Sequence, residues 1–448
     1  MKKTPLKRKL ILLAVLPAFL LLGACAKIEG MFSSDDDLPP LKGTRISLLQ
    51  LQQQLEPSPA LQQTPLVLPA PWANMFWPQV GGYPNHVMGQ PTLGGNLKEA
   101  WKSSIGDGGN SRDPLITQPV VGGGMVFTLD TEGTLAAFDI AGGAKKWHKS
   151  SLPKGSEETG GVGGGIAYDG GKLYVTNGYG QLACFDAATG ATLWRTALQT
   201  PSQSAPTVVN GSVYVVTIDN RLLVFSAADG TATWSYTGVP QTTSLLASIS
   251  PAADDTAIIL PQSSGEILGL NATNGQVLWQ DNISAVNSNG LLAPIDDISQ
   301  PVINQGVVYA ASYSGHMVAF NETTGQRLWQ NDIGSANMPW VAGDNMFVIT
   351  TGQKLVALAL ADGGIRWVTQ LPEYQGDDKN KTVVWAGPVL AGGRLLAASS
   401  DGHLVEVDPQ SGKITRNTEL PGKVLVPPVV ADNTLLVLTD GGALVAYR

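Results

Sequence analysis

The sequence has 448 residues, including 52 glycines; 43% of the residues are hydrophobic and only 14% are charged. Short apolar runs between glycine-rich turns are typical of a β-protein built from many short strands. The formal net charge is −8, and no dense lysine and arginine stripe occurs beyond the first ten residues. These features exclude nucleic-acid binding, which needs clustered cations that displace phosphate counterions.

The N-terminus predicts export and lipid attachment. Five cations in MKKTPLKRK precede an apolar stretch from Leu10 to Leu22, which is too short to span a bilayer. The stretch ends in LLGAC, which resembles a bacterial lipobox, so residues 1–24 are interpreted as a lipoprotein signal peptide and Cys25 as the lipidated residue. The alternative is an ordinary signal peptide with an incidental cysteine. Lipidation of Cys25 leaves Cys184 without a disulfide partner, and we expect Cys184 to be a small buried core residue.

Residues 25–95 differ in composition from the rest of the chain. Polar and proline-rich text such as SSDDDLPP and LQLQQQLEPSPALQQTPLVLPAP predicts a lipid-anchored flexible tether and lead-in. The globular part is predicted to span residues 96–448.

Eight similar strand sequences recur along the globular part: GTLAAFD, GQLACFD, NRLLVFS, GEILGLN, GHMVAFN, QKLVALA, GHLVEVD and GALVAYR. Each contains a large anchor residue, and the anchors are Phe138, Phe185, Phe225, Leu270, Phe320, Leu360, Val407 and Tyr447. The intervals of 40 to 50 residues match the length of a propeller blade, and the strands alternate apolar and polar residues.

Each repeat also contains a hairpin upstream of its anchor and a further strand downstream, which gives four antiparallel strands per repeat. The predicted fold is therefore all-β, an eight-bladed β-propeller. A seven-bladed ring with one decayed unit is the alternative. The last anchor has no room for a fourth strand after it, whereas LKEAW, ending at Trp101, has no anchor before it. We expect this N-terminal strand to pair with the C-terminal one and close the ring, which removes exposed sheet edges.

A turn glycine and a tryptophan follow most anchors, and the seventh repeat has Arg416 in the tryptophan position. The tryptophans could be repeated ligand platforms or packing elements between blades. Burial of a tryptophan removes about 150–250 Å² from water, so packing is the stronger interpretation. The residues predicted to dock neighbouring blades are Trp101, Trp147, Trp194, Trp234, Trp279, Trp329 and Trp367.

The blade motif A-F-D-x-x-T-G-x-x-x-W resembles the PQQ-type repeat of quinoprotein alcohol dehydrogenases. Together with the lipobox and the eight near-uniform blades, it makes the whole mature chain similar to the BamB family, the propeller lipoproteins of the outer-membrane β-barrel assembly machinery. The resemblance implies a non-enzymatic scaffold that assists insertion of β-barrel proteins. It further implies a periplasm-facing protein in a Gram-negative outer membrane, held by its lipid anchor only and monomeric by itself.

The resemblance also implies a partner, the POTRA domains of the barrel subunit BamA. In the family a long loop carries acidic residues that contact them, and here NISAVNSNGLLAPIDDIS contains Leu291, Leu292, Asp296 and Asp297. The aspartates are adjacent and lack the flanking arginine of the family pattern. The alternative is that they only solvate a long loop.

A second family patch corresponds to LQTPSQSAP. This segment retains Leu198, but Pro201 stands where the family has a basic residue. We expect Leu198 to take part in partner binding.

An enzyme holding pyrroloquinoline quinone and calcium is the alternative class, next to a periplasmic propeller scaffold of another complex. Such a site needs carboxylate and amide ligands and, in that family, two adjacent cysteines, which this sequence lacks. The acidic residues recur at turns, as at Asp139, Asp186, Asp229 and Asp362, where we expect them to bond the turn backbone. The four histidines show no metal-ligand spacing. We therefore expect no catalytic residue, no metal and no cofactor.

Overall fold

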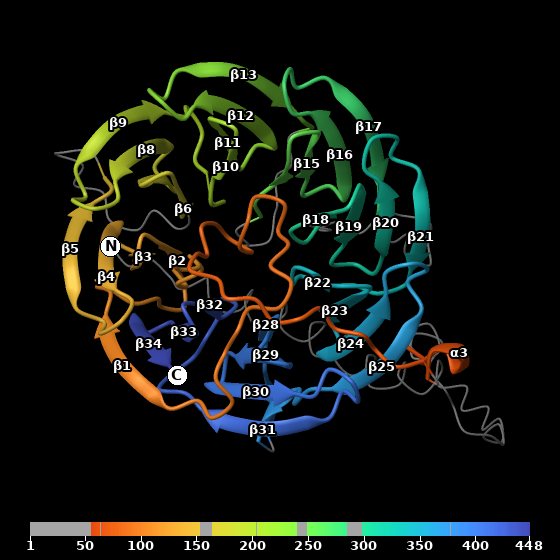
Figure 1. Ribbon diagram of the computed structural model, residues 1–448. Helices are drawn as coiled ribbons and strands as arrows, with labels where there is room; N and C mark the ends of the chain where they lie inside the picture. Colours follow the sequence, from red (N-terminus) through yellow and green to blue (C-terminus); the bar gives the residue numbers. More distant parts are fainter. Residues whose placement is uncertain are drawn as a thin grey trace, which may run out of the picture. The chain divides into compact units, whose positions relative to one another are not determined.

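The computed structural model describes residues 55–62, 64–152, 164–202, 204–239, 249–284, 298–376 and 378–448. Eight four-stranded antiparallel sheets stand around a common centre as the blades of a ring (Figure 1). The predicted all-β, eight-bladed propeller is confirmed, and the seven-bladed alternative is wrong. The helix α3 (Pro59–Gln62) precedes the blades. No helix within the described ranges is long and apolar enough to cross a bilayer.

The first four blades each consist of four consecutive strands, ordered from the centre of the ring outward. They are β2 (Val120–Gly122), β3 (Met125–Leu129), β4 (Thr134–Asp139) and β5 (Lys145–Ser150); β6 (Gly164–Asp169), β7 (Lys172–Asn177), β8 (Gln181–Asp186) and β9 (Thr192–Ala197); β10 (Thr207–Val209), β11 (Ser212–Val216), β12 (Arg221–Ser226) and β13 (Ala232–Thr237); and β14 (Ala252–Ala253), β15 (Ala257–Pro261), β16 (Glu266–Asn271) and β17 (Val277–Asn282).

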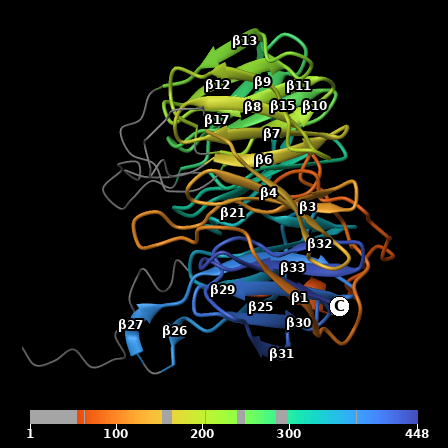
Figure 2. The ribbon, with the colours of Figure 1, turned by 90° about the vertical axis from the view of Figure 1, so that its left-hand side faces the viewer.

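The next three blades follow the same order, and the eighth takes its outer strand from the N-terminal side. They are β18 (Val302–Asn304), β19 (Val307–Ala311), β20 (Met317–Asn321) and β21 (Arg327–Asn331); β22 (Trp340–Ala342), β23 (Asn345–Ile349), β24 (Lys354–Ala359) and β25 (Ile365–Gln370); β28 (Trp385–Ala391), β29 (Arg394–Ser399), β30 (His403–Val407) and β31 (Ile414–Glu419); and β32 (Val429–Ala431), β33 (Thr434–Leu438), β34 (Ala443–Tyr447) and β1 (Glu99–Ser104). A separate hairpin, β26 (Tyr374–Gln375) and β27 (Asp378–Thr382), projects between the sixth and seventh blades (Figure 2).

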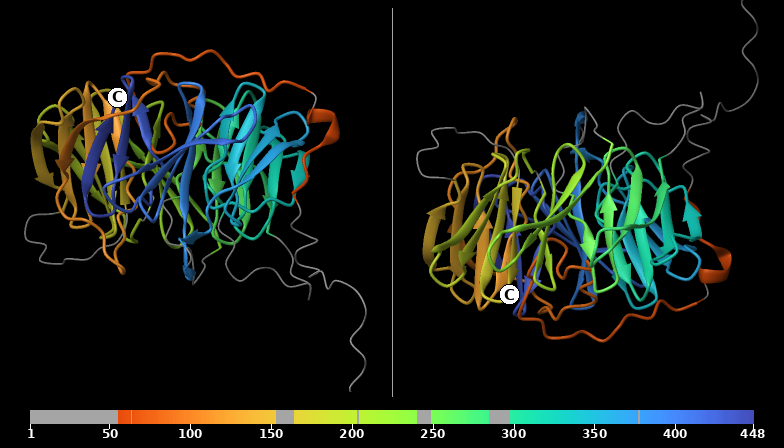
Figure 3. Two further views of the ribbon diagram at one scale, coloured as in Figure 1. Left: turned by 90° about the horizontal axis from the view of Figure 1, so that it is seen from below. Right: turned by 90° about the horizontal axis from the view of Figure 1, so that it is seen from above.

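The antiparallel order gives the ring two different faces. The turns between first and second strands and between third and fourth strands, such as residues 123–124 and 140–144, lie on one face, here called the turn face. The connections between blades and between second and third strands, such as residues 198–206, lie on the opposite loop face. The hairpin β26–β27 projects from the loop face, whereas the segment before β1 crosses the turn face (Figure 3).

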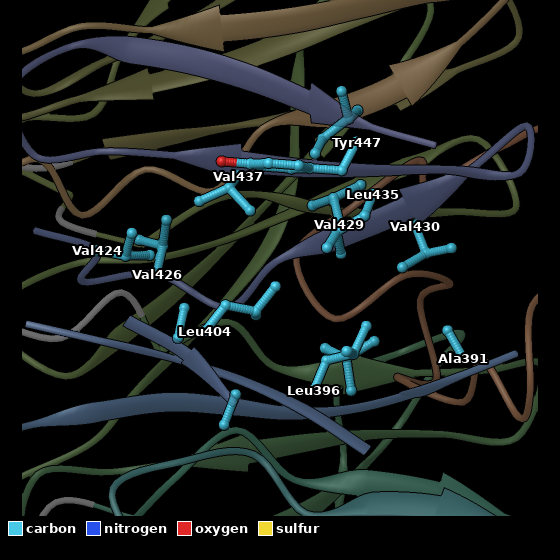
Figure 4. Close-up of a cluster of buried hydrophobic side chains, with 14 of the residues drawn as sticks. Ala391, Leu396, Leu404, Val424, Val426, Val429, Val430, Leu435, Val437 and Tyr447 are labelled. Atoms are coloured by element: carbon cyan, nitrogen blue, oxygen red, sulfur yellow. The ribbon is translucent and has the colours of Figure 1, made fainter. Parts of the chain in front are cut away.

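The core lies between the blades. The three inner strands of a blade are largely buried, as in the pattern iBBBBi of β4, whereas the outer strand β5 has the pattern eeieee. Side chains of neighbouring blades interdigitate; Figure 4 shows Leu396 of the seventh blade facing Leu435 and Tyr447 of the eighth. Cys184 is a core residue too, as expected, and burial raises the pKa of its thiol to about 11.

The two ends of the propeller close the ring as the sequence predicts. Strand β1 pairs with β34, with Trp101 opposite Ala446, and becomes the outer strand of the eighth blade. The last residue, Arg448, extends this contact, because its guanidinium donates to the carbonyl oxygens of Ile140 (2.7 Å) and Ala141 (2.9 Å) in the first blade. The C-terminal residues thereby contact both the closing strand β1 and the first blade.

The anchor residues directly follow a β-bulge in the pairing of the third and fourth strands, for example between Ala319 and Phe320. One anchor prediction is wrong: in the sixth blade the bulge falls between Ala357 and Leu358, so the anchor is Leu358 and not Leu360. Leu358 is fully buried, whereas Leu360 lies beyond the strand in the turn. The segment QKLVALA spans residues 353–359, and its sixth residue, which corresponds to Phe320 in GHMVAFN, is Leu358.

Each of the seven tryptophans lies against the following blade. A Cβ added to the turn glycine of that blade would come within 2.7 Å of the indole ring, at Gly143, Gly190, Gly230, Gly275, Gly325, Gly363 and Gly412. All seven glycines have positive φ, so the turn requires glycine for its backbone as well as for the ring. Five indoles donate to a carbonyl of the same turn: Trp101 to Ile140 (3.0 Å), Trp147 to Ala187 (3.0 Å), Trp279 to Glu322 (2.6 Å), Trp329 to Leu360 (2.8 Å) and Trp367 to Pro409 (2.9 Å).

The seventh blade replaces the tryptophan by a charged cluster. Arg416 lies opposite Glu406, whose carboxylate is 3.5 Å from the Arg416 guanidinium and 2.7 Å from that of Arg394. Glu406 is only 4% exposed, so its charge requires such partners. In this repeat an arginine replaces the tryptophan of the motif. The residue opposite it, Glu406, is acidic, whereas the other blades have a small or apolar residue at that position.

The segment before β1 crosses the turn face from α3 to the closing strand, and its residues 64–98 are here called the lead-in (Figures 1 and 3). It hydrogen-bonds to the inner strand, or to the turn after it, in all eight blades. These bonds run from Val121 N to Trp77 O (2.8 Å), Tyr168 N to Pro78 O (2.7 Å), Gln79 Nε2 to Val208 O (2.7 Å), Ala253 N to Pro84 O (2.9 Å), Ile303 N to Asn85 O (3.0 Å), Trp340 Nε1 to Gly89 O (2.9 Å), Gly392 N to Pro91 O (2.9 Å) and Asp432 N to Asn74 O (2.8 Å).

The lead-in therefore differs from the flexible tether expected for residues 25–95. Leu66, Trp77, Met88 and Leu93 are buried in the same core cluster as the sixth, seventh and eighth blades. Hydrophobic burial and the hydrogen bonds to every blade fix this part of the chain. Residues 1–54, including the predicted signal peptide and Cys25, lie outside the described residues.

The lead-in also buries a titratable group, His86, which is 2% exposed and donates from Nδ1 to the carbonyl oxygen of Pro301 (2.6 Å). Burial lowers its pKa from 6.5 to about 4 because a charged imidazole cannot be solvated there. Between these two pH values the unfolded chain binds a proton and the folded chain does not. Folding stability is therefore fully present above pH 6.5 and falls as the pH drops toward 4.

We expect this one histidine to remove about 2 kcal/mol of stability between pH 7.5 and pH 5. The measurement is the free energy of unfolding in urea at both pH values for the native protein and for His86→Asn, which suits the positive φ of 63° at this position. The variant should lose correspondingly less stability on acidification. The exposed His148, changed in the same way, is the control; an equal effect of both substitutions would contradict the assignment to His86.

Candidate functional site: the loop face and the ring centre

The acidic loop predicted to bind the partner lies between the fourth and fifth blades. Its residues Leu291, Leu292, Asp296 and Asp297 lie outside the described residues, which end at Ser284 and resume at Ile298. Both flanking residues are at the loop-face ends of strands, because Ser284 follows β17 and Ile298 precedes β18. The role of these four residues stays a prediction.

Leu198 is described and does not lie on the surface. Its side chain is 1% exposed and packs with Tyr174, Cys184 and Phe225 in the core between the second and third blades. Its backbone N–H donates to the carbonyl oxygen of Gly180 (2.8 Å). In this conformation the Leu198 side chain is too buried to contact a partner directly. It can only support the surface residues beside it.

A hollow of about 270 Å³ adjoins this loop between the second and third blades. Leu198 and the exposed Gln199 line one side, and Arg221, Phe225 and Trp234 line the other. The hollow therefore brings a guanidinium next to the Leu198 loop. Pro201 stands where the family has a basic residue, and the fold brings a basic residue to the same loop from β12, twenty residues further along.

The centre of the ring contains a cavity of about 190 Å³ on the loop-face side of the lead-in. Residues before the inner strands of several blades form its wall, and a tight turn of the lead-in forms its floor. In this turn the backbone groups of Gln79 and Gly82 bond each other in both directions at 2.9 Å, which brings Val80 and Gly81 to the cavity. The full lining is Trp77, Val80, Gly81, Ile116, Gln118, Ile249, Ile298, Ser299, Gln300, Ala336, Asn337, Met338, Trp340, Gly387, Pro388, Val389, Leu425, Val426 and Pro427.

The described lining does not fit a quinone with calcium. It contains no aspartate, glutamate, lysine or arginine, whereas a hard cation requires carboxylate ligands and an anionic quinone requires cations. In the described part of the chain no three metal-ligating side chains come together. The residues at the ring centre thus offer neither the charge nor the ligands of that enzyme class.

The recurring acidic residues bond turn backbone as the sequence predicts. Asp139 accepts from the N–H groups of Ala141 (2.9 Å) and Gly142 (3.1 Å), and Asp362 accepts from Gly364 N (2.9 Å). The nearby ammonium of Lys146, which donates to the carboxylate, lowers the pKa of Asp139. These carboxylates stabilise turns on the turn face and do not converge on a reacting centre.

The eight four-stranded blades and their repeated contact between turn glycine and tryptophan define a class of protein, the eight-bladed propellers with PQQ-type repeats. Within this class, a sequence model described as outer membrane protein assembly factor BamB matches residues 131–369 and 376–448. These ranges comprise more than half of the chain, and the chain belongs to this family. The match includes strands of all eight blades, whereas β1, β2 and β3 precede it.

Individual relatives agree with this assignment. A Yersinia pestis protein named outer membrane protein assembly factor BamB is 27% identical over 356 residues, which are 78% of this chain and 88% of the relative. The crystal structure of BamB from Moraxella catarrhalis has a TM-score of 0.67 at 21% identity and covers 79% of this chain and 100% of its own. A europium-containing methanol dehydrogenase has a TM-score of 0.64 at 14% identity over 81% of this chain and 89% of its own. The two structural likenesses show the shared propeller fold.

Sequence reasoning missed the lead-in and the cavity that it closes. The only local signal was the segment WPQVGGYPNH, in which Gly81 and Gly82 both have positive φ (74° and 106°). A side chain at Gly82 would collide with Met88, since its Cβ would lie 2.1 Å from the Met88 Cγ. A glycine pair next to an isolated tryptophan can mark a buried turn, but its place at the ring centre follows only from the fold.

Proposed function

We propose that this chain is a non-enzymatic scaffold lipoprotein of the outer-membrane β-barrel assembly machinery. It binds the POTRA domains of BamA and assists the insertion of β-barrel proteins. The observation that carries the proposal is the family match over residues 131–369 and 376–448. A lipid on Cys25 tethers the propeller to the outer membrane on its periplasmic side.

The loop face is the surface that we assign to BamA. The Leu198 loop connects blades on this face, and the described residues on either side of the predicted acidic loop, Ser284 and Ile298, lie at loop-face ends of strands. The turn face is covered by the lead-in, which leaves the loop face as the larger surface available to a partner. We infer that the acidic loop contributes charge, and that the hollow with Arg221 beside Leu198 contributes shape and a guanidinium.

The quinoprotein dehydrogenase remains the competing function because such enzymes share the fold. The uncharged lining of the axial cavity speaks against it, since the described residues there offer no ligand to calcium and no acid or base. A scaffold in another periplasmic complex would share the fold and the anchor but bind a different partner.

The test is capture of the full-length lipoprotein from detergent-solubilised membranes. A large β-barrel protein with POTRA domains is expected to be recovered with it. In the Asp296→Lys/Asp297→Lys variant we expect recovery to fall at least tenfold, because reversing two charges that attract the partner converts attraction into repulsion.

The matched control reverses two exposed aspartates on the turn face, Asp255→Lys/Asp344→Lys, with the same change in net charge. This variant should retain the partner. Undiminished recovery with the Asp296/Asp297 variant would refute the acidic-loop contact, and recovery of a different complex by the native protein would refute the scaffold assignment itself. Co-purification of a quinone chromophore would favour the enzyme.

A further inference from the structure

Apolar side chains are exposed along one segment of the lead-in. Between residues 65 and 76 every exposed residue is apolar, and these residues are Pro65, Val67, Ala70, Pro71, Trp72, Ala73, Met75 and Phe76. The four largest are here called the lead-in patch: Val67 is 69%, Met75 52%, Phe76 41% and Trp72 36% exposed. Exposed large apolar side chains normally occur singly, so four of them on one short segment indicate a contact surface.

The protein holds the aromatic members of the patch in place. Trp72 donates from its indole Nε1 to the carbonyl oxygen of Met88 (2.9 Å), and its ring stacks on that of Tyr83 with centroids 6.4 Å apart. Phe76 stacks in the same way on Tyr168 of the second blade, also at 6.4 Å. The patch is therefore exposed by a fixed segment and does not depend on a rearrangement of the lead-in.

Backbone groups of this segment already have partners. The N–H of Trp72 donates to the Gln90 carbonyl (3.0 Å), and its C=O accepts from Thr92 N (2.9 Å). The C=O of Val67 accepts from Asn345 Nδ2 (2.7 Å) in the sixth blade. An added protein strand needs free backbone groups, whereas lipid contacts apolar side chains without hydrogen bonds. The patch therefore suits a bilayer better than a further strand.

The lead-in carries almost no charge. Between Glu56 and Lys98 the sequence contains no aspartate, glutamate, lysine or arginine, and its one histidine, His86, is buried. Asp344, in the turn next to Val67, is exposed. Anionic headgroups attract clusters of lysine and arginine, which this segment lacks. A zwitterionic lipid surface, in which aromatic and apolar side chains enter the interface, matches it instead.

The position of the patch in the chain also points to the membrane. Residues 26–54 connect the predicted lipid on Cys25 to Leu55, the first described residue, and the lead-in follows soon after α3. Figure 3 shows this part of the lead-in running along the outside of the turn face. The anchor thus brings the bilayer to the end of the chain that carries the patch.

We propose that the lead-in patch inserts its side chains into the interface of the lipid bilayer that holds the anchor. The turn face then lies against the membrane, and the loop face points into the periplasm toward the partner. The acyl chains supply the attachment, and the patch sets the orientation of the ring. The proposal rests on the proposed function only for the lipid on Cys25.

The first test is flotation of the full mature chain without its lipid, as the Cys25→Ser protein, on vesicles of phosphatidylcholine and phosphatidylethanolamine. We expect Val67→Asp/Met75→Asp to lower vesicle binding about tenfold or more, because charged side chains do not enter the interface. The matched control is Ile218→Asp/Val239→Asp, which changes two residues on the loop face that are 43% and 58% exposed and should bind as the parent does. No binding by the parent, undiminished binding by Val67→Asp/Met75→Asp, or stronger binding when phosphatidylglycerol is added would each overturn the proposal.

The second test uses the lipidated protein in the same vesicles with one nitroxide label. Cys184 is buried and Cys25 is acylated, so Met75→Cys or Ile218→Cys supplies the reactive thiol. The label at position 75 should be several-fold more accessible to oxygen, relative to a water-soluble nickel chelate, than the label at position 218. Equal exposure of both labels to water would overturn the membrane contact.

Two further outcomes separate this proposal from its alternatives. A concentration-dependent dimer in solution that Val67→Asp/Met75→Asp abolishes would assign the patch to a second copy of the chain and overturn the bilayer contact. Neither test contains the barrel partner. Failure of both therefore leaves the scaffold assignment standing, and failure to capture the partner leaves the lead-in patch standing.

Discussion

Trp279→Ala is expected to lower the free energy of unfolding by about 3–5 kcal/mol. Trp279 is 7% exposed and stacks on Phe320 of the next blade at 5.3 Å. Its indole N–H donates to the Glu322 carbonyl oxygen (2.6 Å), which would be left buried and unpaired. The loss therefore combines an interior cavity with a missing hydrogen bond at one blade interface.

The measurement is chemical denaturation followed by circular dichroism, with Leu278→Ala as the control. Leu278 precedes Trp279 on β17 but is 41% exposed, so its truncation should change stability by less than about 0.5 kcal/mol. Trp329→Ala should cost less than Trp279→Ala, because Trp329 is only half-buried. Equal stability of Trp279→Ala and Leu278→Ala would show that the tryptophans do not hold the blades together.

Trp77→Ala is the second substitution with a large expected effect, again about 3–5 kcal/mol. Trp77 is 1% exposed at the ring centre, and its backbone N–H and C=O both bond to Val121, at 2.9 and 2.8 Å. Removing its side chain enlarges the axial cavity and deletes the stacking on Trp340. The lead-in then loses its largest buried contact with the blades.

Two measurements separate a general loss of stability from release of the lead-in. Thermal unfolding should show a lower Tm, and limited proteolysis should cut the lead-in before the blades. Met75→Ala, at a position 52% exposed on the same segment, should do neither. A Trp77→Ala variant whose lead-in is as resistant to protease as in the native protein would refute the role of this residue as the central attachment.

The candidate site was predictable only in part. The repeat explains Asp139 and the turn aspartates, and the resemblance to the family directed attention to Leu198 and to the loop with Asp296 and Asp297. It did not reveal that Leu198 is buried, because burial depends on Phe225, which belongs to the next blade. Nor did it reveal Arg221 beside that loop, since the two meet only when β12 packs against the second blade.

The sequence by itself determined the number of blades, their four strands and the closing strand. It could do so because each repeat encodes its strands, turn glycine and tryptophan within 38 to 50 residues, and the contacts of one blade are repeated in the next. Such local, periodic information survives even where one unit departs from it. Arg416 replaces a tryptophan, yet its strand β31 pairs as in the other blades.

Only the tertiary structure decided where the lead-in lies and that it closes a cavity at the ring centre. Residues 64–98 have no period, and their hydrogen bonds join positions as far apart as Asn74 and Val430, separated by 356 residues. Whether a proline-rich segment stays extended in water or packs depends on the surface that it meets. Here that surface exists only after eight blades have assembled and presented their inner strands to one face.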